Sequence, residues 1–303
     1  YLNEVVVVGY GTQKKVNVTG AVGVVDGKDL AMRPVNSAAQ ALQGADPSLL
    51  LTMGNGSVEG SEYSVSIRGN VSINSGSPLI LIDGVEGSLG QVNPNDIESV
   101  SVLKDASACA IYGAKASAGV VLINTKNGST GKASISYDGR VSLSTNTTST
   151  DFITSSYDYV TLCNEFYEYY KGYGAWTFTE DQIEMMKERR YDVTENPERP
   201  WVIPDETGTY QYVYLGNFDW YDFLFKRTRP ETEHNISVRG GTDKVKYFVS
   251  GRYLYREGLF NNEGEDKFNG FNLRSKIDAK LTNWLTYSNS LSFERQLYTY
   301  GGF

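Results

Sequence analysis

A pair of carboxylates beside two aromatic rings is the arrangement in this sequence that comes nearest to a catalytic or binding constellation. Asp219 and Asp222 flank Trp220 and Tyr221. Such a group could stack on and hydrogen-bond a sugar ring, or supply the two carboxyl groups of glycoside hydrolysis. No independent sign of an acid and base pair accompanies it. The sequence therefore predicts a protein that is not an enzyme.

Other residues that could hold a phosphate, a metal or a nucleophile are better explained by structure. Glycines spaced GxxGxxG within residues 84–90 are not followed by a helix with Lys-Ser/Thr, which favours turn glycines. The acidic residues within 263–266 match no calcium-site spacing and are interpreted as solvated loop charge. Cys109 and Cys163 lack a CxxC motif or a histidine neighbour, so both are expected to be structural. His234 is the only histidine, which leaves no zinc site and no Cys-His nucleophile. We therefore expect no metal and no cofactor.

Composition favours a β-rich chain. The 303 residues include 22 Tyr, 12 Phe and 31 Gly but only 4 Met. A net charge of −8 with scattered Lys and Arg argues against nucleic acid as a partner. No apolar run reaches the length of a transmembrane helix, although barrel strands need only about 9 to 11 residues of alternating character. The chain begins at Tyr1 without a signal peptide pattern, so a targeting signal is expected to have been removed or to lie upstream.

The first 126 residues have a mixed pattern of short elements. Residues 4–8 read Glu-Val-Val-Val-Val, which favours an extended strand waiting for a partner, or else an ordinary edge strand. A short helix is predicted over residues 35–45, with Asn36 or Ser37 as its N-cap. A second short helix is predicted over 105–112 with Asp105 as N-cap. Strands are predicted at 48–53, 63–68, 78–83, 97–103 and 120–125, which makes this part a small α+β domain.

After Lys132 the sequence pattern changes to long segments in which apolar or small residues alternate with polar ones. This period of two is typical of strands with one apolar and one polar face. Strands of 11 to 13 residues exceed the usual length in globular sheets, about 5 to 6 residues, and suit a tilted bilayer crossing. The alternation runs through residues 132–143, a strand headed by His234, 245–256, 271–281 and 285–293.

The connections between these strands are of two kinds. Tight turns are predicted at 240–243 and 282–283, whereas the links 144–233 and 257–268 are long. Short turns at one end and long loops at the other are typical of an outer-membrane β-barrel, with the long loops outside the cell. The longest link carries predicted helices at 157–170 and 180–191, so we expect a folded element there. Its aromatic residues form either its own small core or a surface for a ligand or partner.

Several motifs in this chain resemble those of SusC-like TonB-dependent transporters. Residues 92–100 and 103–113 read VNPNDIESV and LKDASACAIYG, and with GVVLI at 119–123 they resemble the signature of that family's plug domain. Further resemblances lie at 4–11 (the segment with the TonB box), 66–69 (SIRG), 78–85 (PLILIDGV), 219–221 (DWY) and 237–241 (SVRGG). The resemblance covers essentially the whole chain.

The resemblance implies a transmembrane β-barrel with an α+β plug domain in its lumen. It further implies that TonB, energised by ExbB and ExbD, pulls on the N-terminal segment, and that a SusD-like surface lipoprotein covers the external loops, in a dimer of SusCD pairs in the outer-membrane lipid. A barrel that holds a plug has about 22 antiparallel strands, and five strands cannot close around a plug. We therefore expect the sequence to be incomplete. The family usually carries an extra periplasmic domain before the TonB box, and none is seen in this sequence.

The sequence patterns and the family resemblance together predict the domains and the site residues. The domains are residues 1–18 (TonB box and linker), 19–128 (plug) and 129–303 (first barrel strands, with an external loop at about 146–232). Arg68 is expected to pair with carboxylates of the barrel wall. The residues expected to couple to TonB are Glu4, Val5, Val6, Val7, Val8, Gly9 and Tyr10. The residues expected to contact the ligand are Asn70, Val71, Ser72, Ile73 and Asn74 at the outward tip of the plug, with Asp219 and Trp220.

The hypothesis that best fits these features is TonB-dependent import of an oligosaccharide, or a peptide, across the outer membrane. A passive porin or adhesive surface barrel is the alternative, and a soluble β-rich binding domain or lectin is a third hypothesis. Glycan leads peptide as the ligand because aromatic residues are abundant and because of the family resemblance.

Overall fold

The computed structural model describes residues 5–8, 11–14, 22–33, 35, 37–53, 63–67, 77–206, 208, 210–261 and 266–299. The chain divides into two compact units, which are described separately. The first unit comprises Tyr1–Leu143, Pro230–Gly258 and Gly264–Gly302. The second unit comprises Ser144–Arg229 with Leu259–Glu263 and Phe303.

The first unit contains an N-terminal domain built around a five-stranded sheet. The strand order is β3-β8-β9-β6-β7, and only the β6–β9 pair is parallel. The strands of this sheet are β3 (Val22–Asp26), β6 (Leu79–Ile82), β7 (Val85–Glu86), β8 (Ile97–Leu103) and β9 (Val120–Thr125). β8 and β9 are buried along almost their whole length, as expected for strands at the centre of a sheet that is covered on both sides.

Short elements cover this sheet. α2 (Ala38–Leu42) begins at Ser37, whose hydroxyl accepts a hydrogen bond from the Gln40 N–H and so caps the helix. The other elements of the domain are α1 (Gly27–Ala31), the hairpin β4 (Leu49–Met53) and β5 (Tyr63–Ile67), α3 (Ala106–Cys109) and 3-10 turns at Leu89–Gln91, Pro94–Asp96, Ala110–Tyr112 and Ala114–Ala116. Leu30 and Leu42 of these elements pack with Ile97, Val100 and Val121 of the sheet in one apolar core. A second apolar cluster contains Leu103, Cys109, Ala116 and Val120.

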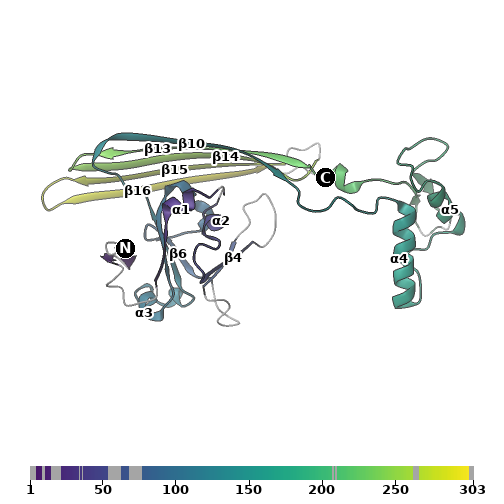
Figure 1. Cartoon of the computed structure of the whole chain (residues 1–303), viewed down its shortest axis with the longest axis horizontal. Coiled ribbons are helices and arrows are strands. Elements are labelled where there is room, and N and C mark those ends of the chain that lie inside the picture. Colours follow the sequence, from purple (N-terminus) through teal and green to yellow (C-terminus); the bar gives the residue numbers. More distant parts are fainter. Residues whose placement is uncertain are drawn as a thin grey trace. The chain divides into compact units, whose positions relative to one another are not determined.

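Five long strands make the second sheet of this unit, called the long sheet below (Figure 1). Their order is β10-β13-β14-β15-β16, and the pairs β13–β14, β14–β15 and β15–β16 are antiparallel. The strands are β10 (Gly131–Thr145), β13 (Thr228–Gly241), β14 (Val245–Glu257), β15 (Lys267–Lys280) and β16 (Thr286–Thr299). Each has 13 to 15 residues, so the prediction of long strands is confirmed.

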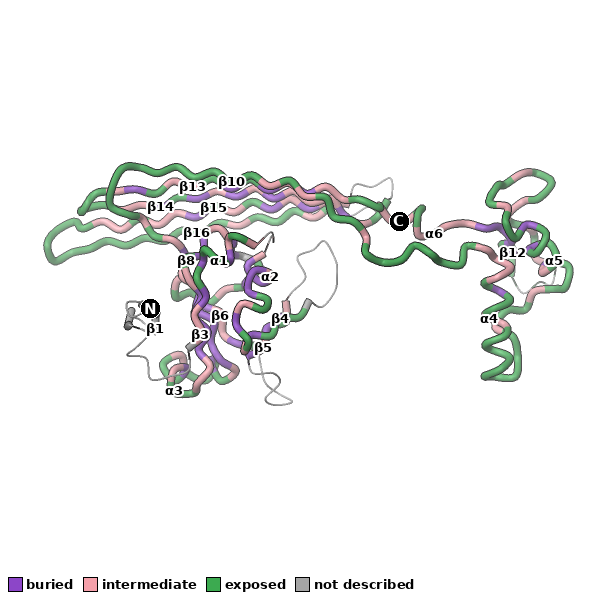
Figure 2. Tube along the Cα trace, viewed as in Figure 1, coloured by how far each residue is buried: buried purple, intermediate pink, exposed green. Residues whose placement is uncertain are grey.

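The two faces of the long sheet have opposite character. Buried positions alternate along β13, β14 and β15 (Figure 2). We call the face that contacts the N-terminal domain the inner face. Its buried side chains are mostly polar or charged: Glu231, Glu233, Asn235, Ser250, Arg252 and Arg274, with Phe248, Leu254 and Phe268. The outer face exposes large apolar side chains: Ile135, Val141, Ile236, Val249, Phe271, Leu273, Ile277, Leu291 and Phe293.

The second unit is a small folded element with its own core. Its elements are α4 (Ser156–Lys171), α5 (Glu180–Glu188), β11 (Val202–Pro204), β12 (Tyr212–Tyr214) and α6 (Trp220–Leu224). Val160, Met186, Val213 and Leu215 are buried together. Thr179 and Gln182 form a reciprocal capping box at the start of α5. The expectation of a folded element with two helices is confirmed, and β11, β12 and α6 were not predicted.

Residues 5–8 form the strand that the sequence predicts, but the strand is not unpaired. β1 (Val5–Val8) pairs antiparallel with β2 (Gly11–Lys14) in a two-stranded sheet. The prediction of an extended segment is therefore confirmed. One edge of β1 is hydrogen-bonded to β2, which agrees with the interpretation as an edge strand, and the binding of a partner along its other edge stays a prediction. None of the helices in the described part of the chain has the length and apolar character that a bilayer-crossing helix requires.

Candidate functional site

A tight turn of the N-terminal domain carries the first of two carboxylates that contact the long sheet. Ile82 pairs with Val85, which leaves Asp83 and Gly84 as a two-residue loop between β6 and β7. Both residues have positive φ, 50° at Asp83 and 86° at Gly84, as a hairpin turn of this length favours. Asp83 is the only residue other than glycine with positive φ among the described residues. Asp tolerates this conformation better than most residues, and the turn fixes the direction of its side chain.

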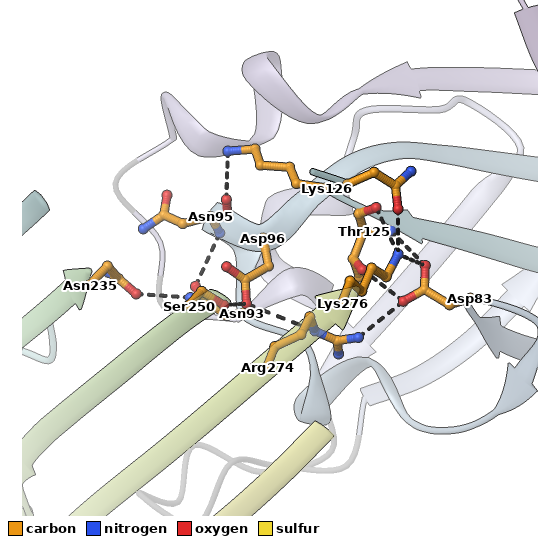
Figure 3. Close-up of polar contacts among 11 residues, drawn as sticks. Asp83, Asn93, Asn95, Asp96, Thr125, Lys126, Asn235, Ser250, Arg274 and Lys276 are labelled. Atoms are coloured by element: carbon orange, nitrogen blue, oxygen red, sulfur yellow. Dashed lines mark hydrogen bonds and ion pairs between the residues drawn. The ribbon is translucent and has the colours of Figure 1, made fainter. Parts of the chain in front are cut away.

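Asp83 binds groups from both sides of the interface (Figure 3). Within its own domain, the backbone N–H and the hydroxyl of Thr125 donate to its carboxylate at 2.9 and 2.7 Å. From β15 of the long sheet, Lys276 Nζ donates at 2.7 Å and an Arg274 guanidinium nitrogen donates at 3.0 Å. Burial raises the pKa of Asp83, but the hydrogen bonds from Lys276 and Thr125 and the positive charge of Lys276 outweigh it, so this pKa lies below its ordinary value.

Asp96 is the second carboxylate, and its surroundings are poorer in donors. It ends the 3-10 turn Pro94–Asp96 immediately before β8. The hydroxyl of Ser250 on β14 donates to Asp96 at 2.7 Å, while Arg274 Nε lies 3.9 Å away. Burial raises the pKa of Asp96 above its ordinary value, because the Ser250 hydrogen bond and the charges of Arg274, Lys126 and Arg252 offset it only in part.

Neutral amides extend the contact to β13. The Asn93 side chain caps the 3-10 turn by accepting from the Asn95 N–H, and it donates to the Asn235 side chain at 2.9 Å. Asn235 donates in turn to Glu233, which also accepts from Arg252 Nε at 2.7 Å. Glu233 is only 1% exposed, so this ion pair is held inside the inner face. Its second carboxylate oxygen lies 3.6 Å from Arg140 of β10.

The segment that leaves the N-terminal domain is bound at the same place. Lys276 Nζ also donates to the Thr125 carbonyl at 3.0 Å and to the Asn127 side chain at 3.2 Å. Lys126 donates to the Asn95 carbonyl at 2.7 Å, and burial lowers the pKa of Lys126. A Cβ on Gly128 would lie 2.3 Å from the Tyr247 backbone nitrogen, so only glycine allows this close approach to β14.

These contacts make a buried polar interface rather than a catalytic centre. We use polar interface for Asp83, Asn93, Asp96, Thr125 and Asn127 of the N-terminal domain with Asn235, Ser250, Arg274 and Lys276 of the long sheet. Hydrogen bonds to charged groups, such as those of Arg274 and Lys276 to Asp83, contribute about 1.5–3 kcal/mol. The interface therefore fixes one relative position of the two parts of the first unit.

The predicted coupling and plug residues lie only partly within the described chain. Val5, Val6, Val7 and Val8 form β1, while Glu4, Gly9 and Tyr10 lie outside the described residues. Arg68 and the five ligand residues Asn70, Val71, Ser72, Ile73 and Asn74 also lie outside them. In the described contacts the polarity is the reverse of that expected for Arg68, because acidic residues of the N-terminal domain meet basic residues of the long sheet.

Asp219 and Trp220 belong to the second unit. The Asp219 side chain accepts from the Asp222 N–H and so caps α6, and Asp222 pairs with Arg227 at 2.6 Å. The Trp220 ring packs edge-on against Phe218 at 4.7 Å between ring centroids, and it remains 55% exposed. The two carboxylates thus have structural partners, while more than half of the Trp220 side chain stays exposed.

Asp83, Asp96, Arg274 and Lys276 were not predicted from the sequence as site residues. Asp83–Arg274 and Asp83–Lys276 join residues 191 and 193 positions apart, a distance that no local pattern reveals. Two signals were available: the Asp-Gly turn between two apolar runs, and basic residues on the polar face of a long strand.

The comparisons with known proteins agree with this geometry. Residues 14–120 match the family described as TonB-dependent Receptor Plug Domain. The chain resembles the RagAB peptide importer in its open-open state, with 29% identity, a TM-score of 0.70 and coverage of 95% of this chain and 32% of that one. The N-terminal domain is thus a plug domain of the TonB-dependent receptor type, and it lies against the inner face of the long sheet.

Two curated relatives narrow the family. TonB-dependent receptor SusC of Bacteroides thetaiotaomicron is 32% identical over 304 residues, which covers 93% of this chain and 26% of the relative. TonB-dependent receptor P3 of Formosa agariphila is 31% identical over 289 residues, which covers 93% of this chain and 24% of the relative. The chain belongs to the SusC-like TonB-dependent receptors, and it spans about a quarter of the length of these curated relatives. The N-terminal domain is called the plug domain below.

Proposed function

We propose that this chain is part of an outer-membrane importer that takes up an oligosaccharide or a peptide with energy supplied through TonB. In this proposal the long sheet contributes to the wall of a barrel of about 22 strands, and the plug domain occupies its lumen. TonB, energised by ExbB and ExbD, acts on residues 4–10, and no catalytic step is assigned to the chain.

The observation that carries this proposal is the inverted polarity of the long sheet. Its inner face buries charged and polar groups against the plug domain, and its outer face exposes apolar side chains. A soluble sheet would bury the apolar face, because that face loses most by contact with water. An outer apolar band with a polar interior is the arrangement of transmembrane barrels, which also argues against the soluble lectin.

Backbone pairing supports the coupling role of the N-terminal segment. In the described two-stranded sheet, each strand has one edge that is not paired with the other strand. An unpaired strand edge can accept a strand of another protein, and the main-chain hydrogen bonds so formed resist a pull along the chain.

The substrate and the lipoprotein partner are proposed from the relatives. One structural neighbour is named a peptide importer and one curated relative is named SusC. We propose a glycan first and a peptide second, a SusD-like lipoprotein as the external lid, and assembly as a dimer of such pairs. Within the chain, residues 70–74 with Asp219 and Trp220 are the proposed ligand contacts, and Arg68 is a proposed contact between plug and wall.

Deleting residues 4–10 from the full-length receptor tests active import against a passive barrel. Import of the substrate that supports growth should stop while the amount of receptor in the outer membrane is unchanged. A deletion of equal length in the exposed stretch 147–153, which lies between β10 and α4, is the control and should leave the energy coupling intact. Uptake that continues at the same rate in the 4–10 deletion would favour the porin alternative.

A further inference from the structure

The polar interface divides into two groups that differ in strength. The Asp83 group joins Asp83, Thr125 and Asn127 of the plug domain to Lys276 and Arg274. The Asp96 group joins Asn93 and Asp96 of the plug domain to Asn235 and Ser250. Figure 3 shows the two groups on neighbouring strands, with Arg274 between the two carboxylates. Among the other contacts described between the domain and the sheet, Arg140 donates to the Val35 carbonyl at 3.0 Å.

The Asp83 group is the stronger one. Its carboxylate accepts four hydrogen bonds, two of them from cationic donors, and such charge-assisted bonds are about twice as strong as neutral ones. It also lies where the chain passes from the plug domain into β10, so a covalent connection runs beside it. Gly128 packs against the β14 backbone on the same connection.

The Asp96 group is weaker. Among the described contacts the Asp96 carboxylate accepts one hydrogen bond, from the Ser250 hydroxyl, and its distance of 3.9 Å to Arg274 Nε is too long for another. The Asn93–Asn235 contact is a hydrogen bond between two neutral amides. Because Asp96 is buried with few donors, its ionised form is poorly compensated.

A load applied at the N-terminus reaches these groups along different elements. The chain enters the plug sheet at β3, whose first residue Val22 pairs with Leu103 at the far end of β8. Asp96 precedes Ile97, the first residue of β8. β8 therefore connects the loaded strand directly to the Asp96 group. Asp83 and Thr125 belong to the β6–β7 turn and to β9, one or more strands further from β3.

We propose that the plug domain is hinged to the sheet: under a pull on the N-terminal segment the Asp96 group separates first, and the domain turns about the Asp83 group while it stays attached there. This inference rests on the proposed function for its biological setting. Ser250 and Asn235 then form the contacts that separate first, called the catch below. Lys276 forms the contact that stays in place, called the hinge below. A passage would then open on the Asp96 side without loss of the plug domain.

A pulling experiment on the full-length receptor tests the order of separation. The receptor, with Cys109 and Cys163 replaced by serine, is held in a supported bilayer and pulled from its N-terminus in an optical trap. Two cysteine pairs are compared after reaction with a short bismaleimide: Asn93→Cys with Asn235→Cys across the catch, and Asn127→Cys with Lys276→Cys across the hinge. Peptide mass spectrometry establishes which molecules are linked.

The unlinked receptor should show an early yielding event before final detachment of the plug domain. The catch link should abolish that event, and the hinge link should leave it in place. Ser250→Ala should lower the force of the early event, whereas Ser288→Ala, which removes a hydroxyl bonded only to Asp278 of the same sheet among the described contacts, should not.

Either a single detachment event in the unlinked receptor or loss of the early event in the hinge-linked receptor would overturn the proposal. This measurement needs neither substrate nor TonB. A failure of the hinge is therefore distinguishable from a failure of the proposed function, which the deletion of residues 4–10 tests separately.

Discussion

The plug sheet and the long sheet are both antiparallel for most of their pairs, yet they bury opposite kinds of side chain. β8 and β9 bury valine, leucine and isoleucine, as in Val100, Val121 and Ile123. β13 and β14 bury glutamate, asparagine, serine and arginine. The difference shows that alternation gives two faces to a strand, while the medium on each side decides which face is covered by protein. Substitutions that add a charge to an apolar face, or remove one from the polar interface, test this difference between the two sheets.

The largest effect is expected from a charge in the plug core. Val100→Asp places a carboxylate at a fully buried position of β8, between Val25 and Ile123 in the sheet register. An unpaired buried charge costs about 3–5 kcal/mol, a large share of a domain's stability, so the plug domain should be digested by protease in the otherwise intact receptor. Ser292→Asp on the inner face of β16 is the matched control and should leave the plug domain resistant.

The next effect concerns the outer face of the long sheet. Leu273→Arg puts a charge on the exposed apolar face of β15, and a lipid-facing arginine near mid-membrane costs about 2–4 kcal/mol. The neighbouring Asn272→Arg, on the inner face, should cost much less because its side chain points the other way. Urea titration of both full-length variants folded into liposomes measures the difference. Equal destabilisation would mean that the two faces see the same medium.

A smaller effect separates the two carboxylates of the polar interface. At neutral pH, Asp83→Asn should destabilise the plug domain by about 1.5–3 kcal/mol, since hydrogen bonds to charged groups are lost. The depressed pKa of Asp83 means that its stabilisation is present above the ordinary carboxyl pKa and is lost as the pH falls through the folded-state value.

Asp96 should behave in the opposite way. Because its pKa is raised, ionised Asp96 lowers the stability of the plug domain at neutral pH. This destabilisation is relieved as the pH falls below the pKa of Asp96 in the folded state. Asp96→Asn should therefore be neutral or stabilising at neutral pH. Thermal unfolding of the plug domain between neutral and acid pH compares both variants with the unchanged receptor. Parallel pH profiles for the two variants would show that the carboxylates do not differ.

The smallest effect tests whether Asp219 is a ligand contact or a helix cap. Asp219→Ala should destabilise α6 by about 0.5–2 kcal/mol, whereas Asp219→Ser retains a capping oxygen and should not. Hydrogen exchange of residues 220–224 in the full-length receptor measures this. If Asp219→Ser keeps the helix but loses glycan binding, the carboxylate contacts the ligand directly.

The sequence was most informative where a local pattern determines structure. The alternation after Lys132 placed Arg274 and Lys276 on the polar face of their strand, and the Ala-rich segment after Ser37 placed α2 with its cap. What the pattern could not reveal is which polar groups meet. The partners of Asp83 and Asp96 depend on the register of β14 and β15 against a separate domain, and that register is set by the assembled fold.

The pairing of β1 shows the same limit. Four consecutive valines predict an extended segment, because β-branched residues disfavour a helix. They do not specify the partner. In the structure the partner is β2, whose paired residues lie three to nine positions further along the chain. The partner of a strand and the contacts between buried polar groups were thus the features that needed the structure.

Solvent exposure along β15 tests the central claim most directly. Single spin labels at residues 270–277 of the full-length receptor in liposomes report collisions with oxygen, which dissolves in lipid, and with a water-soluble nickel chelate. We expect high oxygen and low nickel access at Phe271, Leu273, Ser275 and Ile277, with low oxygen access at Arg274 and Lys276. High nickel access at the odd-numbered positions would contradict a lipid-facing outer face.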